Sequence, residues 1–141
     1  MAVTSEATTL WKGTLTGGSG TTNLDTSGAA TLPVTWASRS GAASDTTTPE
    51  ELIAAAHSAC YSMALSHTLT EHGTPPESIQ VVAAVTFQPG TGITGSHLLV
   101  NAKVPGISEA DFLRITDEVK DGCPVSQALS GISITLEATL S

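Results

Sequence analysis

The chain has 141 residues and a formal net charge of −8, which comes from 13 acidic and 5 basic side chains. Charged residues make up 13% of the chain, about half the usual share of roughly 25%, and hydrophobic residues make up 40%. So few cations supply no basic patch for nucleic acid or for an anionic membrane surface, and the plentiful apolar residues exclude a disordered chain. We therefore expect a single domain over residues 1–141, with no nucleic acid and no membrane among its partners.

The N-terminal part of the chain predicts three strands. Residues 9–16, 21–26 and 32–37 alternate loosely and are separated by turns rich in glycine and serine, a pattern typical of a β meander. Residues 38–47 then predict a polar loop, which carries Arg39.

The strongest helix signal in the chain follows this loop. Thr48 fits the N-cap, Pro49 the first helical position and Glu51 the third, which together form a capping box. We expect a helix over residues 49–71, with one apolar face at steps of three and four. The residues of this predicted face include Leu52, Ile53, Ala56, Ala59, Cys60, Met63, Ala64 and His67, and Ala54, Ala55, Leu65 and Leu69 widen it.

The C-terminal half predicts two strands, two helices and a closing strand. Residues 79–88 and 94–104 read as a hairpin, and Ser108 opens a helix that is interrupted at Gly122. A short helix begins at Cys123 and runs to about Leu129, and residues 132–140 alternate as a last strand. This order of elements is typical of the α+β class.

Cys60 and Cys123 are the two cysteines of the chain. Two cysteines are too few for a scaffold held together by disulfides. Because they do not form a C-x-x-C pair, they are not a thioredoxin-type dithiol either. The N-terminus has no signal-peptide pattern, and no stretch reaches the ~20 apolar residues that cross a bilayer. We therefore expect a reducing, cytoplasmic setting, where each thiol is either an inert core residue or a reactive group.

The positions of the two thiols leave both interpretations open. Cys60 lies on the apolar face of the long helix, where burial raises a thiol pKa and makes the thiol inert. Cys123 lies at a helix start, where backbone N–H groups favour a thiolate, and we expect it to be the less buried of the two. If they meet in space, one can be oxidised to a sulfenic acid and the other can condense with it. Their spacing does not show whether they meet.

Two charged residues before and at the start of the long helix could act on Cys60. Arg39 is either a solvated loop cation or a guanidinium that stabilises the thiolate and donates to a peroxide oxygen. Glu50 could hold Arg39 through a paired contact. Ten residues along a helix span about 15 Å, so Glu50 cannot touch Cys60 of its own helix. A site with all three residues would need a fold-back or a second chain, which hints at a homodimer with sites at its interface.

A metal site is not expected. His57 and Cys60 form half of a ligand set, H-x-x-C, but no second pair with metal-ligand spacing accompanies them. We therefore expect no metal ion.

Two segments resemble a known family over nearly their whole length. Residues 48–66, TPEELIAAAHSACYSMALS, and residues 123–129, CPVSQAL, resemble the OsmC branch of the OsmC/Ohr family of organic hydroperoxide reductases. The Ohr branch places an arginine in its early glycine-rich turn. Residues 17–20 here contain none, which favours the OsmC branch and makes Arg39 the local candidate.

The resemblance implies a fold and an activity. The fold is an OsmC-like α+β fold, with antiparallel sheets packed around the cysteine-bearing helix in an intertwined homodimer. The activity is that of a peroxiredoxin-like thiol peroxidase acting on alkyl or lipid hydroperoxides. Cys60 would be the peroxidatic and Cys123 the resolving cysteine, with Arg39 and Glu50 as the activating arginine and its carboxylate partner. No cofactor is implied, and a dithiol of the lipoyl type would reduce the disulfide.

Two other functions stay open beside this one. The same fold could bind a small hydrophobic ligand, with both cysteines passive. It could also be a redox sensor that signals through the disulfide.

Overall fold

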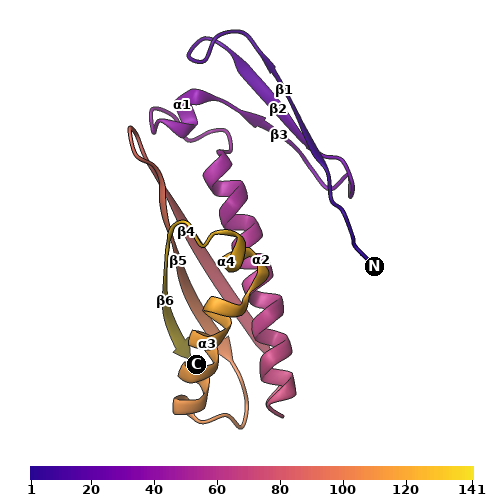
Figure 1. The fold of residues 1–141 in the computed structure, drawn as a ribbon, viewed down its shortest axis with the longest axis vertical. Coiled ribbons are helices and arrows are strands. Elements are labelled where there is room, and N and C mark those ends of the chain that lie inside the picture. Colours follow the sequence, from indigo (N-terminus) through magenta and orange to yellow (C-terminus); the bar gives the residue numbers. More distant parts are fainter. The chain divides into compact units, whose positions relative to one another are not determined.

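The computed structural model describes residues 1–141 and divides into two compact units, Met1–Pro49 and Glu50–Ser141. Each unit contains a three-stranded sheet and at least one helix, which gives a chain of the α+β class (Figure 1). The predicted fold class is therefore confirmed. That both units together make one domain stays a prediction.

The first unit is an antiparallel meander followed by a short helix. Its elements are β1 (Ala7–Lys12), β2 (Ser19–Leu24), β3 (Thr31–Val34) and α1 (Trp36–Arg39). The three predicted strands are present with shifted bounds: the first covers 7–12 rather than 9–16, and the second covers 19–24 rather than 21–26. The third ends three residues early. Thr35 is the reason, because its hydroxyl accepts a hydrogen bond from the Ser38 N–H at 3.2 Å and so caps α1.

The second unit contains the remaining six elements. They are α2 (Pro49–Glu71), β4 (Ser78–Gln88), β5 (Gly92–Lys103), α3 (Glu109–Gly122), α4 (Pro124–Ala128) and β6 (Ser133–Leu140). All six were predicted from the sequence, with bounds that differ by two residues at most. The Ser108 hydroxyl caps α3 by accepting from the Asp111 N–H at 3.1 Å, as the sequence suggested.

The second sheet is mixed. β4 and β5 form an antiparallel hairpin, whereas β5 and β6 pair in parallel. The expectation of purely antiparallel sheets is wrong here, since the chain between β5 and β6 passes through α3 and α4. A crossover of this kind brings the next strand back in the same direction.

One face of α2 packs into the core of the second unit. Tyr61, Leu65 and Leu69 of α2 are fully buried, together with residues of β5 and α3. The core residues of those two elements are Leu98, Val100, Ala102, Phe112, Ile115 and Val119. In Figure 1, α2 lies alongside the sheet and the α3–α4 segment, which agrees with this core.

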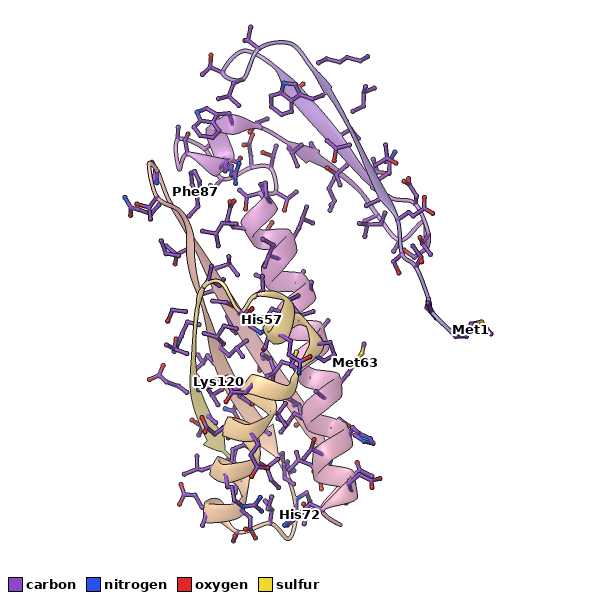
Figure 2. All side chains as sticks on the ribbon, viewed as in Figure 1. Met1, His57, Met63, His72, Phe87 and Lys120 are labelled. Atoms are coloured by element: carbon purple, nitrogen blue, oxygen red, sulfur yellow. The ribbon has the colours of Figure 1, made fainter.

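The buried face of α2 agrees with the predicted one only in part: Leu65 and Leu69 are buried, and Cys60 and Ala64 pack against the core. His57, Tyr61, Leu65 and Leu69 follow each other at steps of four and point into the unit. Met63, which the sequence placed on the buried face, is 73% exposed and projects away from the helix (Figure 2). An alanine-rich helix is apolar on several sides, so periodicity alone does not choose among them.

None of the four helices combines the length and the hydropathy that crossing a bilayer requires.

Candidate functional site

Cys60 lies in the middle of α2 and is half-buried. Its side chain hydrogen-bonds with Cys123 and with the backbone of Val125. Both cysteines are free thiols. The structure therefore brings together the two cysteines that the sequence could not place relative to each other.

Cys123 occupies the junction between α3 and α4. Its N–H donates to the Val119 carbonyl at 3.0 Å, and its own carbonyl accepts from the Gln127 N–H at 3.0 Å. The side chain is fully buried and belongs to the core of the unit. The expectation that Cys123 is the less buried thiol is wrong. The helix junction directs the residue toward the core rather than toward solvent.

The surroundings of Cys60 within the second unit favour the neutral thiol. Burial is the largest cause that raises its pKa, and the neighbouring Cys123 thiol raises it further. The Val125 N–H opposes this because it donates to the sulfur and so favours the thiolate. The net result is a raised pKa.

The cations of the second unit are engaged elsewhere. Lys103 pairs with Glu77 at 3.0 Å, and Lys120 pairs with Asp117 at 3.3 Å. Arg114 contacts two carboxylates of α3 at 3.2 and 3.3 Å. None of these cations contributes to the pKa of Cys60.

His57 precedes Cys60 by three residues and is fully buried. Its Nδ1 lies 2.7 Å from the Ser96 Oγ, and its Nε2 lies 2.8 Å from the Ser126 Oγ. Burial lowers the pKa of this imidazole. Because both ring nitrogens are already hydrogen-bonded to hydroxyls, His57 is poorly suited to the half metal site considered from the sequence.

The contacts of His57 with Ser96 and Ser126 were not predicted from the sequence. One signal was available: His57 lies three residues before Cys60, and Ser126 lies three residues after Cys123. No group of three or more His, Cys, Asp or Glu side chains could hold a metal ion.

Glu50 is buried in the first turn of α2. Since α2 is one continuous helix, ten positions separate Glu50 from Cys60 by about 15 Å along the axis. The structure therefore does not bring Glu50 into contact with Cys60 of the same chain.

Arg39 is the last residue of α1, rather than part of an open loop as the sequence suggested, and it is half-buried. Hydroxyl groups hold the segment around it. The Thr46 Oγ1 lies 2.6 Å from the Ser38 Oγ and 2.9 Å from the Thr35 Oγ1. These side-chain hydrogen bonds hold the turn that bears Arg39 in a defined conformation.

Comparison with known proteins identifies the family. Residues 41–137 match the family model of OsmC-like proteins. The chain belongs to the OsmC-like family. Over 97 residues it is 47% identical to the peroxiredoxin OsmC of Escherichia coli K12, which covers 67% of each chain.

Two further OsmC relatives agree with this result. The organic hydroperoxide resistance protein of Xanthomonas axonopodis pv. citri is 30% identical over 98 residues, which cover 68% of this chain and 69% of the relative. The crystal structure of an OsmC-like protein from Mycoplasma pneumoniae shares the fold, with a TM-score of 0.75, 17% identity and 99% of each chain covered.

The family match does not cover all the candidate residues. The matched range includes Glu50, Cys60 and Cys123 but begins two residues after Arg39. The assignment of Arg39 depends instead on its place before the cysteine helix and on the resemblance described above.

Proposed function

We propose that this OsmC-family protein is a thiol peroxidase that reduces organic hydroperoxides, with Cys60 as the peroxidatic and Cys123 as the resolving cysteine. The observation that supports this most is the hydrogen bond between the two free thiols, which come from different helices. The names of the relatives, a peroxiredoxin and an organic hydroperoxide resistance protein, support the same chemistry.

The proposed reaction has two steps. The Cys60 thiolate attacks the hydroperoxide, forming an S–O bond while the O–O bond breaks, and the leaving alkoxide takes up a proton to become the alcohol. The Cys123 thiolate then attacks the Cys60 sulfur. An S–S bond forms, the S–O bond breaks, and hydroxide leaves as water after protonation. An external dithiol, which we propose to be of the lipoyl type, returns both cysteines to thiols.

Activation of Cys60 requires a positive charge that the second unit does not supply. We assign this role to Arg39, whose planar guanidinium can stabilise a thiolate and donate two hydrogen bonds to a peroxide. Glu50 is assigned to orient Arg39 through a paired contact. Since Glu50 cannot touch Cys60 along its own helix, the complete site would combine residues of two chains.

Exposed apolar surface in both units supports a homodimer. Helix α2 exposes Met63 together with the small residues Ala56 and Ala59. In the first unit Leu10 is 60% exposed, and the buried core contains no residue of that unit. Apolar surface of this kind typically marks an interaction site, and a second copy of the same chain would cover it symmetrically.

Steady-state turnover tests the proposed function. With a lipoyl-type dithiol as reductant, we expect the protein to reduce cumene or t-butyl hydroperoxide in preference to hydrogen peroxide, because apolar walls favour an alkyl group. Cys60→Ser should abolish turnover, since the peroxidatic sulfur is lost. Full activity in that variant, or no activity of the wild-type protein with any hydroperoxide, would overturn the proposal.

A further inference from the structure

The imidazole of His57 connects three elements of the second unit. It projects from α2 toward β5 and α4, where it contacts Ser96 at 2.7 Å and Ser126 at 2.8 Å (Figure 2). His57 is fully buried, and the two serines are 1% and 3% exposed. All the polar atoms of this group are thus satisfied without solvent, and the serine hydroxyls can complement a neutral ring that has one donor and one acceptor.

The α4 end of this bridge belongs to the cysteine site. Ser126 is the third residue of α4, and Cys123 immediately precedes that helix. Between them, Val125 directs its backbone toward the Cys60 sulfur. The segment from Cys123 to Ser126 therefore contains both groups that hydrogen-bond with Cys60, the Cys123 thiol and the Val125 backbone.

Backbone hydrogen bonds at the α3–α4 junction and the packing of Cys123 and Val125 hold one side of this short segment. Helix α4 has only five residues, and no side chain caps its N-terminus. The His57–Ser126 contact is buried and joins α4 directly to α2, the helix that carries Cys60. Movement of α4 away from α2 would have to break this contact, and it would withdraw the Cys123 thiol and the Val125 N–H together.

We propose that His57 is a positioning residue, which holds the first turn of α4 against α2 so that Cys123 and the Val125 N–H stay at Cys60. This inference rests on the proposed peroxidase function for its biological meaning, but it concerns a geometry that can be measured without a peroxide. The contact to Ser126 does the positioning, and the contact to Ser96 anchors the ring to the sheet.

Two substitutions of His57 separate its two contacts. The amide nitrogen of glutamine can occupy the place of Nε2, so His57→Gln can keep the contact to Ser126. The amide nitrogen of asparagine can occupy the place of Nδ1, so His57→Asn can keep only the contact to Ser96. Both variants lose the ring and one hydrogen bond. Asparagine is also one methylene shorter than glutamine, so the two serine variants described below, which remove the same atom, are the comparison that excludes a packing effect.

Alkylation of Cys60 by iodoacetamide, quantified by peptide mass spectrometry over a range of pH, is the first readout. We expect His57→Asn to shift the profile to higher pH and to slow alkylation near pH 7 about tenfold, because the N–H donor to the thiolate is lost. We expect His57→Gln to stay within about threefold of the wild-type protein. Equal profiles for the two variants would overturn the proposal.

Formation of the Cys60–Cys123 disulfide is the second readout. Oxidised dithiothreitol accepts the two electrons and two protons that the thiols release, and it is reduced in the process. We expect His57→Asn to lower the equilibrium fraction of the disulfide, and His57→Gln to leave it closer to the wild-type value. A disulfide equilibrium that is the same in both variants would contradict the positioning role.

Serine variants keep the proposal testable if a His57 variant does not fold. Ser126→Ala and Ser96→Ala each remove one buried hydroxyl from the same ring, and circular dichroism checks that both are folded. We expect Ser126→Ala to slow Cys60 alkylation more than Ser96→Ala does, while equal effects would overturn the proposal. If the wild-type protein reduces no hydroperoxide but these variants differ as expected, the proposed function fails and the positioning role stands.

Discussion

The thiol of Cys60 in α2 and the thiol of Cys123 at the start of α4 are hydrogen-bonding partners. One is half-buried and the other is fully buried. A sulfenic acid formed on Cys60 would therefore have its condensation partner in place, within the protein and shielded from solvent.

Cys123→Ser should separate oxidation from turnover. Cys60 can still react once with an organic hydroperoxide, but no neighbouring thiol can resolve the sulfenic acid. We expect one equivalent of alcohol as the sulfenic acid forms and no steady-state cycling. Excess hydroperoxide should then over-oxidise Cys60 to the sulfinic acid, which releases a second equivalent of alcohol. Mass spectrometry of the treated variant measures these products. Sustained cycling at the wild-type rate would show that Cys123 is not the resolving cysteine.

Arg39→Gln should raise the pKa of Cys60. The second unit already favours the neutral thiol, so removal of the activating guanidinium leaves the thiolate without its main support. We expect the pH profile of Cys60 alkylation to move to higher pH and peroxidase turnover near pH 7 to fall about tenfold or more. Arg39→Lys is the matched control, because it keeps a charge but loses the planar pair of donors.

An unchanged thiol profile in Arg39→Gln would contradict this assignment. Partial recovery in Arg39→Lys would indicate that charge contributes, and the remaining deficit would measure the paired donors.

Protonation of His57 should destabilise the fold at acid pH. Burial lowers the pKa of His57 in the folded protein, so below its ordinary value the unfolded chain binds this proton more readily. Stability due to the neutral ring is therefore fully present above about pH 6.5 and is lost as the pH falls below that value. Urea unfolding of the wild-type protein and of His57→Gln at a series of pH values tests this. The difference in free energy of unfolding between the two should shrink on acidification, and a constant difference would contradict the prediction.

Met63→Glu should disrupt the proposed homodimer. Met63 is 73% exposed on a face of α2 that also exposes alanines, and a carboxylate placed in an apolar interface is costly. Leu113→Glu is the control, since Leu113 is 45% exposed on α3 and lies on another helix. Light scattering after size exclusion should show a monomer for Met63→Glu and a dimer for Leu113→Glu. If the wild-type protein is a monomer at the concentration of the turnover assay, that result would contradict a site that combines residues of two chains.

The sequence predicted the elements of the second unit well because their signals are local. Pro49 and Ser108 mark helix starts, and alternation marks the strands, all within a few residues. The fold family followed from the two cysteine segments. By contrast, the third strand was predicted too long because the cap at Thr35 depends on a single hydroxyl contact.

Non-local features of the site could not be predicted in the same way. The burial of Cys123 depends on the angle at the α3–α4 junction, and the buried face of α2 depends on which apolar side the sheet covers. The bridge through His57 joins residues of three elements that are distant in sequence. None of these three features can be predicted from the residue spacing within a single segment.

The most direct measurement is a tryptic peptide map of the reduced protein after treatment with one equivalent of cumene hydroperoxide. Cleavage after Arg39, Lys103 and Lys120 places Cys60 and Cys123 in separate peptides, 40–103 and 121–141. The proposed function predicts that these two peptides become linked by a disulfide, with one cumyl alcohol released for each link. Unmodified thiols in both peptides, or oxidation without any link between them, would contradict it.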